Sequence, residues 1–64
     1  MIDFGACLQK AQIEKNVTSA QLARMLGVQR QQITIWRKNK NCRLDTAMKI
    51  CSVLGLGLEE FVSL

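Results

Sequence analysis

The sequence predicts one compact all-α domain of five short helices, on three observations. The chain of 64 residues has no proline and only 5% aromatic residues, a composition that favours helices over a β sandwich. Hydrophobic residues make up 48% of it, which argues against disorder. These residues also recur at intervals of three and four, which is the spacing of one helix face.

A chain this short forms a single domain, residues 1–64, without internal repeats or linkers. Its size lies near the lower limit for folding without disulfides or a metal. Apolar burial and the loss of conformational entropy nearly cancel at this size. We therefore expect a dense core, self-association, or both.

The first predicted helix runs from Ile2 to Lys15, with Asp3 as its N-cap. Its buried stripe is expected to contain Phe4, Leu8 and Ala11. Gly5 in the first turn is expected to weaken this end by about 1 kcal/mol relative to alanine.

The second predicted helix runs from Ser19 to Leu26. Thr18 is its expected N-cap, and Gly27 is expected to end it in a left-handed conformation. A third helix is expected from Gln29 to Arg37 or Lys38. The side of this helix that faces the core is expected to carry Ile33 and Trp36.

The polar and basic segment 38–44 is predicted to be a loop. Asp45 is expected to cap a fourth helix over residues 46–54. A short fifth helix is predicted after Gly57, with Phe61 in the core.

Positive charge is concentrated in the middle of the chain, whose formal net charge is +4. No acidic residue lies between Lys15 and Arg43, a stretch that also contains Arg24, Arg30, Arg37, Lys38 and Lys40. Such a distribution is typical of a surface that binds a polyanion. A solvated surface is one alternative. A basic amphipathic helix on a membrane is another, less favoured because the charges are spread over several short segments.

The composition argues against several kinds of chemistry. Without histidine, the chain lacks the commonest general base and the commonest neutral metal ligand. Its three cysteines, Cys7, Cys42 and Cys51, do not have the C-x-x-C spacing of zinc or redox motifs. The five acidic residues are scattered along the chain. We therefore expect no enzyme activity, no metal and no cofactor.

The sequence shows no signal peptide, and no apolar run approaches the roughly 20 residues that span a membrane. An odd number of cysteines then favours a reducing compartment. A cytoplasmic location without a membrane partner is therefore expected. Cys42 lies in the basic loop, where a lowered thiol pKa would permit redox sensing.

Residues 18–36, TSAQLARMLGVQRQQITIW, have the pattern of two short helices joined by a tight turn. The small residue Ala23 allows the helices to cross closely, and Gly27 allows a positive φ in the turn. Val28 and Ile33 are expected to lock the second of these helices against the first. This is the construction of a helix-turn-helix that binds DNA.

The chain resembles the lambda-repressor/Cro-like, or Xre-type, helix-turn-helix family from about Phe4 to Val62. The resemblance is carried by the pattern T-x-x-x-L-A-x-x-L-G-V-x-x-x-x-I-x-x-W and by K-I-x-x-x-L-G-L-x-L-E-E-F nearer the C-terminus. It implies a compact five-helix lambda-repressor-like domain that binds operator DNA through its second and third helices. The small phage Cro proteins are the members it resembles most, which implies a bacterial cell or a phage-infected host.

The chain departs from the family pattern at four positions. Ser19 stands where glutamine is usual, and Gln29 stands where serine is frequent. The family often has a glutamate where this chain has Arg37, and that glutamate often pairs with an arginine where this chain has Gln12. Both members of the ion pair are therefore expected to be lost together. The added positive charge is expected to strengthen attraction to phosphate.

The resemblance implies that the third helix enters the major groove of DNA. Arginine can bind guanine and glutamine can bind adenine through paired hydrogen bonds, while threonine or isoleucine can touch a thymine methyl group. The expected base contacts are Gln29, Arg30, Gln31, Thr34 and Ile35, with solvated helix surface as the alternative for glutamine. Gln32 is expected to face away from the groove or to approach phosphate. The expected phosphate contacts are Thr18, Ser19, Arg37, Lys38, Lys40, Asn41 and Arg43.

We expect a transcriptional repressor of the Cro type that binds a pseudo-palindromic operator in double-stranded DNA. It would act as a homodimer, at least on DNA, and without a small-molecule effector. The candidate dimer contacts are Leu56, Leu58, Val62 and Leu64, which exceed what one short helix can bury. A protein-binding adaptor or an antitoxin with the same fold is the alternative.

Overall fold

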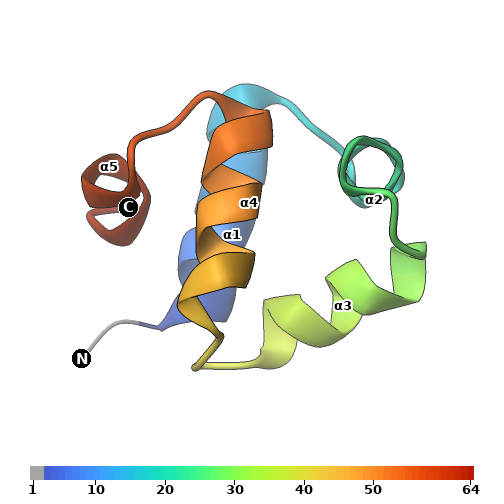
Figure 1. Ribbon diagram of the computed structural model, residues 1–64, viewed down its shortest axis with the longest axis horizontal. Helices are drawn as coiled ribbons and strands as arrows, with labels where there is room; N and C mark the ends of the chain where they lie inside the picture. Colours follow the sequence, from blue (N-terminus) through green and yellow to red (C-terminus); the bar gives the residue numbers. More distant parts are fainter. Residues whose placement is uncertain (1–2) are drawn as a thin grey trace.

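The computed structural model describes residues 3–64, which form five α helices and measure 27 × 21 × 20 Å overall. Figure 1 shows α2 and α3 on one side of α1 and α4, and α5 on the other side. The all-α, five-helix prediction is therefore confirmed. Ile2, where the first helix was predicted to begin, lies outside the described residues. The helices are α1 (Phe4–Lys15), α2 (Ser19–Leu26), α3 (Arg30–Lys38), α4 (Leu44–Leu54) and α5 (Leu58–Val62).

One apolar core takes side chains from all five helices. Leu8, Leu22 and Ile33, from the first three helices, are 0% exposed. Phe61 of α5 is 1% exposed, and its ring centroid lies 6.0 Å from that of Phe4. Because this aromatic pair joins the first and last helices, the domain closes around a single core.

The ends of α1 and α2 follow the sequence prediction. Asp3 Oδ1 accepts a hydrogen bond from the Ala6 N–H at 3.1 Å, and so caps α1. Thr18 and Gln21 form a reciprocal capping box, with the Gln21 N–H on Thr18 Oγ1 at 3.1 Å and the Thr18 N–H on Gln21 Oε1 at 2.9 Å. Gly27 ends α2 in the left-handed region at φ 70°.

The start of α4 differs from the prediction. Asp45 was expected to be the N-cap, but the helix begins one residue before it, at Leu44, and Asp45 lies in the first turn. Arg43 is the N-cap residue, and its carbonyl accepts the Ala47 N–H at 3.1 Å. Asp45 still favours the helix, because a carboxylate near the N-terminus interacts well with the helix dipole.

Gly5 has a packing role that the sequence alone did not indicate. Its N–H donates to the carbonyl of Asn39 at 2.7 Å, and the Phe4 N–H donates to the carbonyl of Lys40 at 2.9 Å. A Cβ at Gly5 would lie 2.7 Å from the Asn39 oxygen and would also meet the carbonyl of Arg37. The helix start is therefore bound to the α3–α4 loop, and only glycine permits this close approach.

Candidate DNA-binding surface

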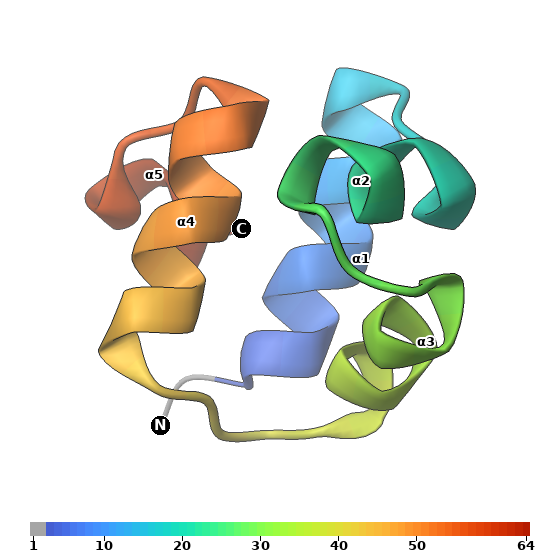
Figure 2. The ribbon, with the colours of Figure 1, turned by 45° about the vertical axis from the view of Figure 1, so that its right-hand side comes forward.

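The helices α2 and α3 cross at a tight turn, as the motif predicts (Figure 2). Ala23 is 4% exposed, and its carbonyl accepts the Val28 N–H at 3.0 Å. Val28 packs against the core beside the turn, and Ile33 is fully buried. These contacts fix α3 against α2 and leave the opposite face of α3 outside the core.

That outer face of α3 carries the residues predicted to contact bases. Trp36 packs against the core, and Gln32 is half-buried. Thr34 directs its hydroxyl to the Arg30 carbonyl at 3.4 Å, which leaves its methyl group on the surface. The exposed residues on the α3 segment include Gln29, Arg30, Gln31, Thr34 and Ile35.

Ile35 is an unusual surface residue, because it is 52% exposed on a helix that is otherwise mostly polar. Gln31 lies one helical turn before it, so an amide and an apolar side chain share one face. This pairing suits the edge of a base pair, where hydrogen-bonding groups adjoin a thymine methyl.

Three residues predicted to contact phosphate, Thr18, Ser19 and Arg37, line one surface depression. Gln12 also lines it. The capping box uses the Gln21 N–H, whereas the N–H groups of Ser19 and Ala20 have no intrahelical acceptor. The depression therefore combines a guanidinium, hydroxyl groups and the positive end of a helix dipole.

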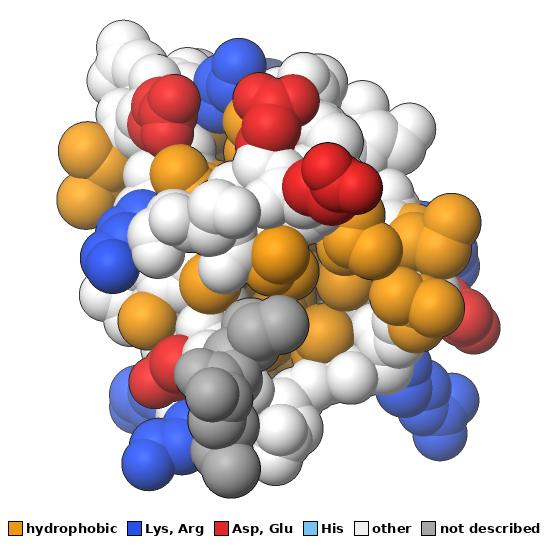
Figure 3. Space-filling model, turned by 90° about the vertical axis from the view of Figure 1, so that its left-hand side faces the viewer, with side chains coloured by type: hydrophobic (Ala, Val, Ile, Leu, Met, Phe, Trp, Pro, Cys, Tyr) orange, Lys and Arg blue, Asp and Glu red, His pale blue; other side chains and the backbone are white. Residues whose placement is uncertain are grey.

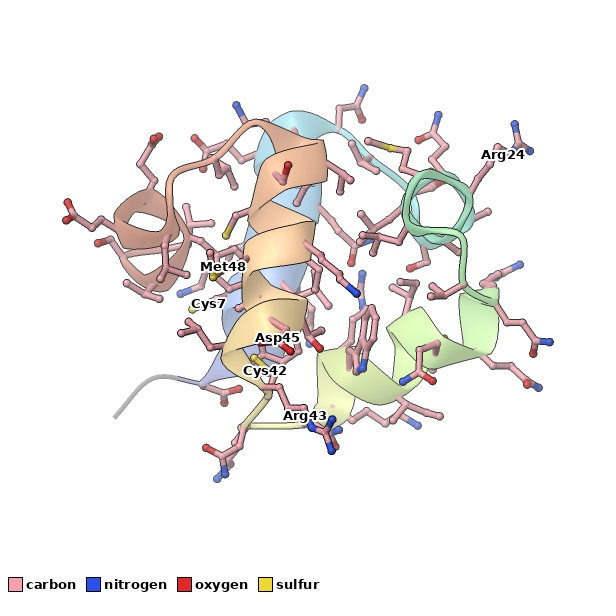
Figure 4. The ribbon with its side chains drawn as sticks, in the orientation of Figure 1. Cys7, Arg24, Cys42, Arg43, Asp45 and Met48 are labelled. Atoms are coloured by element: carbon pink, nitrogen blue, oxygen red, sulfur yellow. The ribbon has the colours of Figure 1, made fainter. Side chains whose placement is uncertain are left out.

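The other four predicted phosphate contacts lie at the end of α3 and in the α3–α4 loop that follows it (Figure 1). These residues are all exposed: Lys38, Lys40, Asn41 and Arg43. Figure 4 shows Arg43 extending away from the body of the molecule at this loop, and Arg24 extending outward from α2. The two hydrogen bonds to Phe4 and Gly5 hold this loop in place beside α3.

Positions 12 and 37 carry no ion pair, as expected from the sequence, but their side chains still meet. The Arg37 guanidinium donates to Gln12 Oε1 and so links α3 to α1, although no carboxylate is involved. Gln9 adds a second link, because its Nε2 donates to the Arg37 carbonyl at 3.0 Å. A neutral hydrogen-bonding group has taken the place of a charged partner.

The lowered thiol pKa considered for Cys42 is not found. Cys42 is exposed in the α3–α4 loop, but desolvation raises the pKa of its thiol, and a hydrogen bond with the backbone of Ala47 lowers this pKa by a smaller amount. Burial raises the pKa of Cys51, with a further rise from the charge of Cys42. A raised pKa reduces the thiolate fraction, and this disfavours redox sensing by Cys42.

The prediction that Leu56 is a dimer contact is wrong, because its side chain is only 8% exposed and belongs to the core of its own chain. Val62 and Leu64 are half-buried against that core. Leu58 is 38% exposed and is the most accessible of the four.

The sequence interpretation missed two apolar residues on α4. Leu44 is 61% exposed and Met48 is 56% exposed, one turn apart. With Leu58 they form an apolar face beside a groove whose lining includes Phe4 and Val62. Figure 3 shows apolar side chains gathered on the side of the molecule that bears α5. The sequence carries a signal for this face, because Leu44 and Met48 are four residues apart and lie outside the buried stripe of α4.

Among residues 3–64, the longest helix has 12 residues, and none has the length and hydropathy needed to cross a membrane. A comparison with curated proteins finds no significant match. A family model described as the Cro/C1-type HTH DNA-binding domain matches residues 8–64, which is most of the chain and includes all of α2 and α3. The chain therefore belongs to the Cro/C1-type helix-turn-helix DNA-binding family.

Proposed function

We propose that this protein is a Cro-type transcriptional repressor that binds a pseudo-palindromic operator as a homodimer. The observation that carries the proposal is the exposed face of α3, which presents Arg30, Gln31 and Ile35 on the helix that leads into the basic loop (Figure 1). No acidic residue lies in the sequence between Lys15 and Arg43, a stretch that includes all of α2 and α3. The protein acts on DNA in the cytoplasm and needs no cofactor, metal or catalytic group.

In this proposal α3 lies in the major groove and reads base edges. The Arg30 guanidinium forms a bidentate pair with guanine, and the Gln31 amide forms one with adenine. Ile35 contacts a thymine methyl group. Each good bidentate pair contributes about 1–3 kcal/mol of discrimination against the wrong base. Gln29 and Thr34, the remaining predicted base contacts, contact bases beside those that Arg30, Gln31 and Ile35 read.

Phosphate contacts fix the position of α3 in the groove. One strand meets the depression formed by Thr18, Ser19 and Arg37, where the dipole of α2 adds to the charge of the guanidinium. The other strand meets Lys38 and the exposed residues of the α3–α4 loop. These contacts are independent of sequence and give binding its salt dependence.

The apolar face of Leu44, Met48 and Leu58 supports a homodimer. Water-exposed side chains of this size, adjacent to an apolar groove, favour association with a matching surface. α5, which carries Leu58, lies across α1 and α4 from α2 and α3 (Figure 1), so a second copy placed against this face leaves both α3 helices free. Lys40 and Asn41 also line the groove, and the second copy must leave these two side chains exposed to contact phosphate. A two-fold dimer of this kind matches a pseudo-palindromic site. Val62 and Leu64 lie at its margin.

Binding-site selection from random duplex DNA tests the proposal directly. We expect enrichment of an inverted repeat whose half-sites lie about one helical turn apart, 10–10.5 base pairs, or a multiple of it. A selection that returns no sequence above background would overturn the operator proposal and favour a protein-binding adaptor or an antitoxin. Repression by occupancy is then tested by placing the selected site across a promoter.

A further inference from the structure

Gln12 is the one polar residue among the buried side chains of residues 3–64, with 4% exposure. It connects three segments of the chain. Its Nε2 donates to the carbonyl of Val17 and to Ser19 Oγ, both at 3.3 Å, and its Oε1 accepts from the Arg37 guanidinium. A flipped amide would turn its NH₂ group towards Arg37, so these partners fix one orientation.

The neutrality of this amide determines the charge of the depression above it. A carboxylate at the same place would neutralise the Arg37 guanidinium, whereas an amide holds the guanidinium and leaves its full positive charge. Arginine has five N–H donors, and the bond to Gln12 uses one of them. The remaining donors stay available to an anion at the depression.

Gln12 has a parallel effect on Ser19. Because Ser19 Oγ accepts a hydrogen bond from Gln12, the hydroxyl hydrogen of Ser19 points away from Gln12 and is available to an acceptor. Ser19 and Arg37 both line the depression. One buried amide therefore orients two donors at the same place on the surface.

We propose that Gln12 is a positioning residue for DNA binding, which holds the Arg37 guanidinium and the Ser19 hydroxyl towards one backbone phosphate while preserving the charge of Arg37. Gln12 does not touch the DNA. This inference rests on the proposed DNA-binding function and assigns a role to a residue beneath the contact surface.

The test compares Gln12→Glu with the original protein on duplex DNA of random sequence, by fluorescence anisotropy over a series of salt concentrations. The carboxylate keeps the bond to Arg37 but neutralises its charge. We expect affinity at low salt to fall about tenfold, as for loss of a charge-assisted hydrogen bond. The log–log salt slope is expected to decrease in magnitude by about 1 per subunit. Lys10→Gln is the matched control, because it changes net charge equally at a residue that bonds the carbonyl of Leu64.

A double-mutant cycle separates positioning from a general effect of charge. Arg37→Gln is expected to weaken binding strongly in the original protein and only slightly in the Gln12→Glu background. Additive losses would overturn the proposal, as would an unchanged slope in Gln12→Glu. Circular dichroism establishes that each variant is folded. If Gln12→Glu does not fold, Gln12→Met removes the tether with little change in volume, and the same coupling to Arg37 is expected.

The failure of the proposed function has a different signature. If the original protein shows no salt-dependent binding to duplex DNA, the DNA-binding function itself is rejected. If the original protein binds and only the coupling between Gln12 and Arg37 is absent, the function stands and the role of Gln12 is rejected.

Discussion

The N–H of Gly5 donates to the carbonyl of Asn39 across 2.7 Å and joins the start of α1 to the loop that follows α3. The two residues are separated by more than half the length of the chain. It fixes the loop that carries Lys40, Asn41 and Arg43 relative to α3, so a backbone contact in the interior organises the proposed phosphate contacts.

Gly5→Ala is predicted to destabilise the fold, because the added Cβ would meet the carbonyl oxygens of Asn39 and Arg37. Overpacking of this kind costs about 1–3 kcal/mol. The free energy of unfolding is measured by urea denaturation. Gly57→Ala is the control, since its nearest neighbour is the end of the Glu60 side chain at 3.4 Å and its φ of −73° suits alanine. Equal stability of the two variants would contradict the close approach at Gly5.

Arg30→Ala and Lys38→Ala are predicted to weaken DNA binding in different ways. Loss of the Arg30 guanidinium removes a base contact, so affinity for the selected operator falls by about 1–3 kcal/mol and discrimination is lost at one base pair. Loss of Lys38 removes a phosphate contact, so binding weakens about equally on all sequences and the salt slope falls by about 1. Both effects are measured on the operator and on scrambled duplexes. A uniform loss for Arg30→Ala would remove it from the base-reading face.

The sequence predicts the helices and the crossing of α2 and α3 because these depend on local signals. Thr18 with Gln21, and Gly27 in the turn, act within a few residues of one another. The function of Gly5 could not be predicted, because its glycine requirement comes from a carbonyl more than thirty residues away. The link between Gln12 and Arg37 was missed for a related reason: a family ion pair indicates where two side chains meet, but not that a pair without opposite charges still bonds.

Cys42 is predicted to react slowly with iodoacetamide at neutral pH, because desolvation raises the pKa of its thiol above the usual value of about 8.5. The folded state favours the neutral thiol, so this stabilisation is present at neutral pH and is lost as pH rises through the raised pKa. Alkylation is followed by mass spectrometry against a small thiol of ordinary pKa. Cys42→Ser identifies the site, since Cys7 and Cys51 are buried until the protein unfolds. A faster reaction than the reference thiol at pH 7 would contradict this.

Leu44→Asp is predicted to weaken self-association without unfolding the domain. Leu44 is 61% exposed at the first position of α4, where a carboxylate interacts well with the helix dipole. In a dimer through the Leu44, Met48 and Leu58 face, the same carboxylate would move from water into an apolar contact, which is unfavourable. We expect the dimer dissociation constant to rise at least about tenfold by sedimentation equilibrium, consistent with truncating a central interface residue. Ile13→Asp is the control, because Ile13 is 79% exposed on α1 and lies outside this face. Equal association of the two variants would place the dimer contact elsewhere.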